Sequence, residues 1–374
     1  MEYNIKNQSK KIYNIVKILK DIVNIASFKN INNEHKIIKY LIKQFTICKE
    51  IVVVESEQGN ANLLIGINTQ LKDLNDCILL SGHIDTVNLG IKFKKCEVID
   101  NKIYGLGAPD MKSFIASIIY NLEKLLKIRT PLVLSLTSDE ETKFLGIKAI
   151  LNELIKRNIK PNLVIVGEPT DVKFSFSNKG ATWFTCSIFG KQCHASTPDL
   201  GINAIQKTVE ILSGINTINK KLVDSSLTVT KINGGELGNM VPEKCMFKLD
   251  IRLSKVKDIE NIKSKLFSIF TNVCENICDF NIEASKLTPP FEKRNSKFLK
   301  NFAISNNIDL IESSFTTEAG VIQQTFCTSN IVIFGPGNAR SIHSENEYIE
   351  IDNLKSYSNL LMDLIKAHDK HNYI

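Results

Sequence analysis

The chain has 374 residues, too many for one ordinary hydrophobic core, so two domains are expected. Its hydrophobic content of 43% and charged content of 23% are typical of a soluble globular protein, and no apolar stretch is long enough to cross a membrane. The net charge of +7 comes from dispersed lysines without a focused basic stripe or stacking aromatics, which argues against a nucleic-acid partner.

Two features bear on the cellular compartment. The N-terminal segment Met1–Lys6 is followed by no apolar stretch of the kind found in secretory signals. The nine cysteines are odd in number and lack paired Cys-x-x-Cys spacing, which indicates reduced thiols rather than disulfides or zinc ligands. We therefore expect a cytoplasmic protein.

The first part of the chain alternates predicted helices and strands. Helices are expected near residues 10–25 and 33–45, and strands at 51–55 and 61–67. Continuous apolar runs then predict buried strands at 77–80, 132–136, 163–166 and 331–334. A helix is expected at 111–128. The alternation as far as Pro169 predicts the α/β class, a mostly parallel mixed sheet flanked by helices.

The pattern changes after Asp171. Residues 173–189 alternate apolar and polar side chains as an antiparallel pair does. Helices at 202–212 and 256–273 follow, with strands at 226–232, 244–253 and 279–285. This order suits an inserted two-layer α+β domain of ferredoxin-like type. The predicted domains are residues 1–172 with 286–374, which form one discontinuous domain, and the insertion 173–285.

The long alternating stretch at 173–189 also bears on assembly. Such a strand offers an edge on which a second copy could extend the sheet. A homodimer through the insertion is therefore expected.

Five short segments carry side chains that can bind a metal, and most of them follow closely on a predicted buried strand. They are 81–85, 107–112, 137–141, 167–170 and 341–343. Sheets of the α/β class place their ligands just beyond the carboxyl ends of such strands. Two histidines and several carboxylates that converge there predict a divalent metal site, with zinc as the first expectation.

The first two segments carry His83, Asp85 and Asp110. His83 and Asp85 share one face of an extended strand end, so Asp85 can hold the second ring nitrogen of a metal-bound imidazole. Alone, this pair is more often a structural histidine beside a turn aspartate, but the Gly-x-x-Asp-Met-Lys segment that follows strengthens the metal interpretation. Asp110 could bridge two metals with its two oxygens, or merely begin a helix.

The remaining segments supply three carboxylates and a second imidazole. Glu140 and Glu141 point to opposite sides of an extended segment, so one can bind metal while the other acts as a general base, unless both belong to a charged loop. Glu168 follows a buried strand and is rigidified by Pro169, although an acidic helix cap is the alternative. A lone histidine such as His343 is more often structural, but here it completes a symmetric two-metal site.

Taken in order, these motifs resemble those of the acetylornithine deacetylase, succinyl-diaminopimelate desuccinylase, aminoacylase and carboxypeptidase G family. The resemblance runs from about His83 to the C-terminus and includes a later Gly-Lys-x-x-His-Ala-Ser segment. It implies a zinc-exopeptidase-like fold, with the insertion as a lid and dimerisation domain. It also implies an amidohydrolase with two Zn²⁺ per chain, which Co²⁺ can replace.

The resemblance also implies a role for each residue. His83 and Glu168 would bind one zinc, Glu141 and His343 the other, and Asp110 would bridge them. Glu140 would be the general base and acid, and Asp85 would be the partner of His83.

The insertion carries further candidates by the same resemblance. His194 resembles the family's lid histidine, which reaches a neighbouring subunit's active site and stabilises the tetrahedral oxyanion. Asn239 and Arg252 match positions that help hold the substrate in relatives. The planar fork of Arg252 suits a substrate carboxylate, although a surface charge on a strand is an equal alternative.

The segment Phe315–Gly320, followed by residues 334–337 and 342–348, is similar to the corresponding segments of acetylornithine deacetylases. Glu318, expected near the mouth of the site, could meet a cationic side-chain amine of the substrate. The expected partner is thus a small N-acyl amino acid, first of all N-acetyl-ornithine, cleaved to ornithine and acetate in arginine biosynthesis. A desuccinylase, an acetyl-lysine or acetyl-citrulline deacetylase and a dipeptidase remain alternatives. An inactive binding protein is disfavoured because every ligand and the base are present.

Overall fold

The computed structural model describes residues 14–28, 34–90, 94–285, 287–292, 296–326 and 328–371. Their contacts divide the chain into two compact units. The first unit takes its described residues from Met1–Ser177, Lys293–Ser313 and Thr317–Ile374, and the second from Asn178–Glu292 and Ser314–Thr316. Each unit has its own hydrophobic core.

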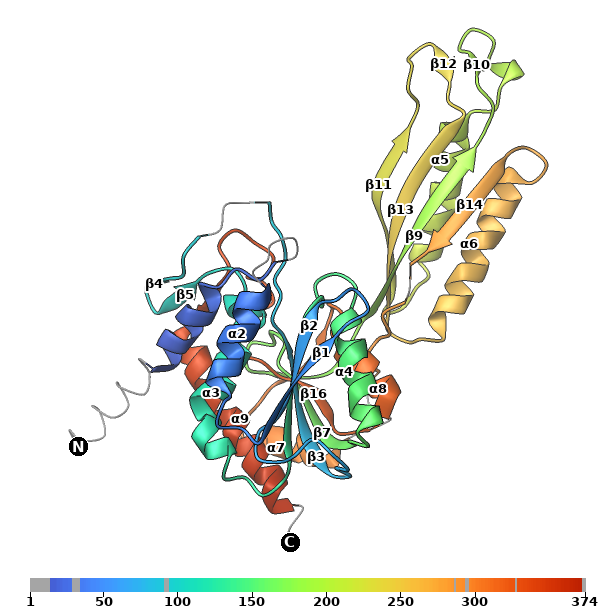
Figure 1. Ribbon diagram of the computed structural model, residues 1–374. Helices are drawn as coiled ribbons and strands as arrows, with labels where there is room; N and C mark the ends of the chain where they lie inside the picture. The colour runs from blue at the N-terminus through green and yellow to red at the C-terminus, as the bar shows by residue number, and fades with distance from the viewer. Residues whose placement is uncertain are drawn as a thin grey trace. The chain divides into compact units, whose positions relative to one another are not determined.

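An eight-stranded sheet forms the centre of the first unit (Figure 1). Its strands, in spatial order, are β1 (Glu50–Glu55), β2 (Ala61–Gly66), β6 (Leu132–Thr137), β3 (Cys77–His83), β7 (Pro161–Val166), β16 (Ile331–Ile333), β8 (Phe174–Asn178) and β15 (Leu310–Ser313). The four strands β6, β3, β7 and β16 run parallel to one another. Antiparallel pairing joins β1 to β2, β2 to β6 and β8 to β16.

Helices cover both faces of this sheet. Figure 1 shows α2 (Glu34–Gln44), α3 (Ser113–Leu125) and α9 (Ile351–His371) on one side, and α4 (Leu145–Lys156) and α8 (Ala319–Phe326) on the other. A helix over residues 14–23 and α7 (Lys297–Ser305) also belong to this unit. Every residue of β3 and β6 is buried, as expected for strands covered on both faces. The predicted α/β class with a mostly parallel mixed sheet is confirmed.

A small sheet and a short irregular segment also belong to the first unit. The small sheet has the order β17 (Tyr348–Glu350), β5 (Lys102–Tyr104) and β4 (Glu97–Ile99). The segment η1 (Ala108–Lys112), in which Asp110 and Met111 have non-helical backbone angles, leads directly into α3, so the helix begins at Ser113 rather than at the predicted Met111. In the described part of the chain, no helix is both long enough and apolar enough to span a membrane.

The second unit is a two-layer α+β structure. Its antiparallel sheet has the order β11 (Ser226–Gly234), β13 (Lys244–Leu253), β9 (Gly180–Phe189) and β14 (Asp279–Ala284). Apolar side chains of this sheet pack with those of α5 (Ala204–Asn219) and α6 (Asp258–Cys274) in one core. The short strands β10 (Cys193–His194) and β12 (Met240–Val241) form a separate antiparallel pair.

The structure corrects two expectations about residues 173–189. These residues form two strands in different sheets, because β8 adds to the large sheet beside β16 and only β9 belongs to the second unit. The division between the units therefore falls after Ser177 rather than after Val172. The expectation of a free edge is also wrong, because β9 pairs with β13 on one side and β14 on the other.

Candidate metal centre

The predicted metal-binding side chains gather at the carboxyl ends of the parallel strands in the first unit. His83 is the last residue of β3, Glu140 and Glu141 follow β6, and Glu168 follows β7. Glycines precede two of these side chains and allow α3 to pack closely beneath them. A Cβ on Gly82 would lie 2.9 Å from the ring of Phe114 in α3, and one on Gly167 would overlap the same ring.

Asp110 occupies the centre of the cluster. One of its oxygens, Oδ1, lies 3.1 Å from His83 Nε2, and the other, Oδ2, lies 3.4 Å from His343 Nε2. The same nitrogen of His343 is 3.1 Å from Glu141 Oε2. A carboxylate whose two oxygens face two different imidazoles has the arrangement that a bridge between two cations requires.

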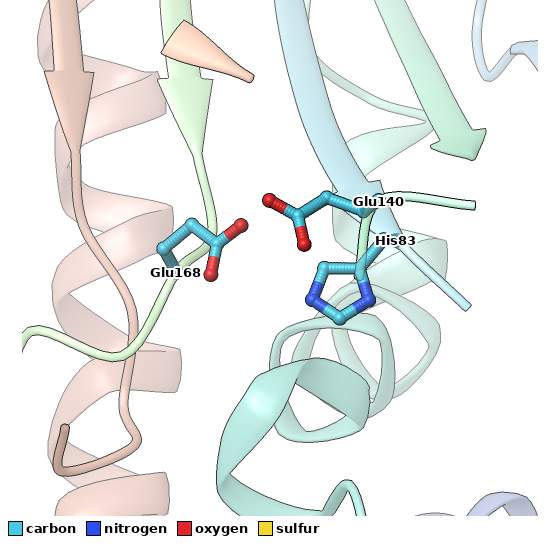
Figure 2. A group of neighbouring side chains, drawn as sticks. All are labelled: His83, Glu140 and Glu168. Carbon is cyan, nitrogen blue, oxygen red and sulfur yellow. The ribbon is translucent and has the colours of Figure 1, made fainter. Parts of the chain in front are cut away.

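The remaining carboxylates close the other side of the cluster. His83, Glu140 and Glu168 each offer a ligand atom, and these atoms lie within 4.8 Å of one another. Figure 2 shows the carboxylates of Glu140 and Glu168 directed toward each other above the His83 ring. A second group with the same spacing consists of His83, Asp110 and Glu141.

One oxygen atom of this cluster lacks a hydrogen-bond partner in the described part of the chain. Glu168 Oε1 is fully buried and has no hydrogen-bond partner among the described residues. A buried carboxylate oxygen without a partner is costly, and a cation is a partner that would satisfy it. The imidazole and carboxylate donors are also the set that binds zinc and similar divalent ions. The residues present therefore fit a metal.

The protonation behaviour of the cluster leads to the same conclusion. Burial raises the pKa of Glu140 and of Glu168 well above the ordinary value, and the other carboxylates raise both further. Hydrogen bonds to Asp110 and Glu141 raise the pKa of His343 to about 10. The cluster therefore holds more buried negative charge than its two imidazoles can neutralise, and divalent cations would supply the difference.

Asp85 plays a part that differs in detail from the predicted one. The Nδ1 atom of His83 lies 2.9 Å from the backbone carbonyl oxygen of Asp85 and 3.5 Å from its carboxylate Oδ1. The carboxylate instead accepts hydrogen bonds from the backbone N–H groups of Glu140, at 3.3 Å, and Glu141, at 3.2 Å. Asp85 thus orients the imidazole mainly through its backbone and holds the Glu140–Glu141 turn through its side chain.

The expectation that Glu318 lies at the mouth of the site is wrong. Its side chain is only 1% exposed. One carboxylate oxygen accepts a hydrogen bond of 2.8 Å from Ser81 Oγ, and the other accepts one from Thr137 Oγ1. Burial raises the pKa of Glu318. Because both oxygens are engaged by strands β3 and β6, Glu318 ties the strand ends together and is not available to an ammonium group in solvent.

The other three predicted residues lie in the second unit. His194 is exposed on β10, with Nδ1 at 2.7 Å from Ser196 Oγ, and Asn239 is exposed next to β12. The structure brings these two together, because the N–H of Ala195 donates to the carbonyl of Asn239. Arg252 lies far along β13 from this pair and forms an ion pair of 2.7 Å with Asp250.

Two buried charged residues near the cluster, Lys112 and Glu347, were not predicted as site residues from the sequence. Lys112 is 1% exposed, and its Nζ donates to the carbonyl of Ile25 at 2.9 Å. Burial lowers the pKa of Lys112 to about 7. Glu347 is 2% exposed, and burial raises its pKa to about 7. Lysines and glutamates are abundant on the surface of this chain, so composition gives no signal that separates these two from the rest.

Comparison with known proteins identifies the family of this chain. The family described as "Peptidase family M20/M25/M40" matches residues 79–367. The acetylornithine deacetylase of Buchnera aphidicola subsp. Acyrthosiphon pisum (strain Tuc7) is 29% identical over 78% of this chain and 80% of its own length. That of Buchnera aphidicola subsp. Schizaphis graminum (strain Sg) is 27% identical over 96% of this chain and 98% of its own length.

Solved structures share the fold at lower sequence identity. Aminopeptidase PepT from Bacillus cereus ATCC 10987 has a TM-score of 0.81 at 21% identity and covers 95% of this chain and 98% of its own. The YXEP protein of Bacillus subtilis, described as a dinuclear metal binding peptidase from the M20 family, has a TM-score of 0.70 at 12% identity. It covers 97% of this chain and 99% of its own.

Proposed function

Because the chain belongs to peptidase family M20/M25/M40 and is a hydrolase of amide bonds, we propose that it deacylates a small N-acyl amino acid, with N-acetyl-ornithine preferred. Water would add to the amide carbon and the C–N bond would break, giving acetate and ornithine, an intermediate of arginine biosynthesis. The observation that carries this proposal is the cluster of two histidines and four carboxylates, buried except at Glu141, which is partly exposed, and His343, which is exposed, in a chain whose relatives are named acetylornithine deacetylase.

We propose that the cluster holds two metal ions. We propose that His83 and Glu168 hold one Zn²⁺, that Glu141 and His343 hold the other, and that Asp110 bridges the two. Co²⁺, which accepts similar ligands, is expected to replace zinc. When bound, such ions polarise the amide carbonyl and lower the pKa of water.

Glu140 is the carboxylate left to move protons. Its side chain is buried, and its pKa is raised well above the ordinary value, first by burial and then by the charge of Glu168. A raised pKa brings a carboxylate close to the range in which it can take a proton from water and later return it to the leaving amine. The Asp85 carboxylate fixes the backbone from which Glu140 extends.

The second unit would supply substrate contacts. We propose that His194 stabilises the oxyanion and that Asn239 and Arg252 help to hold the substrate. His194 is exposed and its ring is oriented by Ser196, so it is available to a ligand. Arg252 directs three of its five N–H groups to Thr316 and Asp250, so two N–H groups remain for a substrate carboxylate.

A substrate panel tests the proposed activity. We expect kcat/KM for N-acetyl-ornithine to exceed that for N-acetyl-lysine, N-acetyl-citrulline, N-succinyl-diaminopimelate and simple dipeptides. Because Glu318 does not face solvent, the preference for N-acetyl-ornithine rests on the relatives. A difference of one methylene between two substrates changes kcat/KM by only about 10–200-fold. Amine release measured on each compound at equal enzyme concentration decides the order. A higher kcat/KM on a succinylated compound or a dipeptide would contradict N-acetyl-ornithine as the preferred substrate. The protein would still be a hydrolase of amide bonds.

We also propose a homodimer in the cytoplasm. The eight cysteines in the described residues are all free thiols, as a reducing compartment requires. In the described residues of the second unit, β11 pairs only with β13, so its other edge offers backbone groups to a second copy. Two apolar side chains of this strand, Val229 and Ile232, are 37% and 49% exposed.

Sedimentation velocity tests the dimer and its edge. The wild-type chain is expected to sediment as a dimer, and Val229→Lys to shift it toward the monomer, because a charged edge strand resists pairing. Val223→Lys is the matched control, since Val223 is 81% exposed and lies outside β11. An active wild-type monomer would contradict the dimer, and equal dimerisation of both variants would contradict the choice of edge.

A further inference from the structure

Glu347 joins two loops of the metal centre through one carboxylate. Its Oε2 accepts a hydrogen bond of 2.6 Å from the backbone N–H of Gly107, and its Oε1 accepts one of 2.6 Å from the backbone N–H of His343. The side chain is 2% exposed. Bonds to an ionised acceptor are short and about twice as strong as neutral ones, so this carboxylate holds both loops firmly.

Each of these loops positions a metal-binding side chain. Gly107 immediately precedes η1, which carries Asp110, and it has a φ of 78°. A Cβ at Gly107 would lie 2.5 Å from Thr86 Cγ2, so the loop follows a tight path. His343 has a φ of 57°, in a region that residues with a Cβ rarely adopt and that its surroundings must maintain.

The backbone of Glu347 is itself fixed in place. Its carbonyl accepts a hydrogen bond of 2.9 Å from the N–H of Gly105, and the next residue, Tyr348, pairs with Tyr104 in the small sheet. The carboxylate therefore projects from a rigid strand end. Since the Nε2 of His343 lies 3.4 Å from Asp110 Oδ2, the separation that Glu347 sets between the two backbones determines whether both side chains reach one ion.

We propose that Glu347 is a positioning residue whose carboxylate sets the distance between the Asp110 loop and the His343 loop, and thereby the affinity of the second metal position. This inference rests on the metal sites proposed above and is independent of the substrate. It predicts a selective effect. The ion held by Glu141 and His343 depends on both loops, whereas the ion held by His83 and Glu168 depends on only one of them.

Metal titration of the variant Glu347→Gln tests this proposal. The amide has one oxygen and one NH₂ group, so one of the two backbone donors would face another donor. When the metal-depleted protein is titrated with Co²⁺, the ion at His83 and Glu168 should bind as in the wild type. The ion at Glu141 and His343 should bind about 10–100-fold more weakly, as is usual when a group that orients a metal ligand is lost. Turnover should recover at Co²⁺ concentrations that fill the weakened position.

Two further variants separate positioning from simple structural support. Glu345→Gln removes the same charge from an exposed site on the same loop and should bind both ions like the wild type. Glu347→Asp keeps the charge but is one methylene shorter, and should fall between wild type and Glu347→Gln in second-ion affinity. If Glu347→Gln does not fold, Glu347→Asp gives the same comparison. A purely structural role would lower the thermal unfolding temperature while leaving the ratio of the two affinities unchanged, which would overturn the proposal.

The outcomes also distinguish this inference from the proposed function. A wild-type chain that binds no Co²⁺ contradicts the metal centre itself. A wild-type chain that binds two ions, together with a Glu347→Gln variant that binds both with unchanged affinity, contradicts only the role of Glu347.

Discussion

The variant Glu140→Gln is expected to retain both metal ions and to lose about 10²–10⁴-fold in kcat, the usual contribution of a positioned general base. The amide has nearly the same shape as the carboxylate but cannot accept a proton from water. The backbone of residue 140 would remain in place, because its N–H is held by the Asp85 carboxylate at 3.3 Å. The loss should therefore appear in kcat and leave KM nearly unchanged.

The neighbouring residue provides a sharp control for this experiment. Glu141 lies 3.1 Å from His343 Nε2, and we assign it to a metal ion. Glu141→Gln should weaken metal binding, and excess metal should restore part of its activity. Glu140→Gln should keep its metal content, and excess metal should not restore its activity. Turnover of Glu140→Gln within about tenfold of the wild type would contradict the role of Glu140 as base.

Removal of divalent metal with a chelator is expected to reduce activity by about 10³-fold or more, because metal polarisation of a carbonyl contributes several kcal/mol to the transition state. Removal should be easier at lower pH. The metal-free His343 has a pKa raised to about 10 by Asp110 and Glu141, so protons compete with metal for this side chain, and lowering the pH favours the protonated form.

Restoring the metal makes this experiment decisive. Zn²⁺ or Co²⁺ should return the activity of the depleted protein, whereas Mg²⁺, which prefers oxygen ligands and octahedral geometry, should not. A metal-depleted protein that keeps its full activity on N-acetyl-ornithine would show that the reaction does not depend on the metal centre.

The sequence predicted that His83, Glu140, Glu141 and Glu168 gather at one sheet edge, because strand ends are local features. A buried parallel strand is a continuous apolar run, so the polar residue that follows it, such as His83 or Glu168, can be placed at the sheet edge without knowledge of the strand order. Their convergence follows from the parallel arrangement of β3, β6 and β7. The segment of Asp110 was predicted less well, because its backbone and that of Met111 are not helical and the expected helix begins only at Ser113.

Other features of the site depend on contacts that sequence patterns do not encode. Glu318 is drawn into the interior by two hydroxyl groups, Ser81 and Thr137, that lie far from it along the chain. The same holds for only one of the two donors to Glu347, since Gly107 lies far from it along the chain and His343 only four residues away. Each of these charged residues accepts at least one hydrogen bond from a distant part of the chain, whereas local sequence suggests only an exposed charge.

The strand alternation at 173–189 illustrates a different limit. Alternation predicts an extended segment with one buried face, but it does not say which strands pair with it. In the structure β9 is central and β8 belongs to another sheet. Partner choice depends on segments as distant as β14, so the expected free edge could not be derived from the stretch itself.

Metal analysis of the purified, active enzyme is the most direct test of the central claim. The protein would be measured for bound zinc, cobalt, manganese and iron per chain in the same sample in which hydrolysis of N-acetyl-ornithine is assayed. We predict about two divalent ions per active chain, held by the ligands around Asp110, since its two oxygens face two separate imidazoles. An active sample without bound divalent metal would contradict the account.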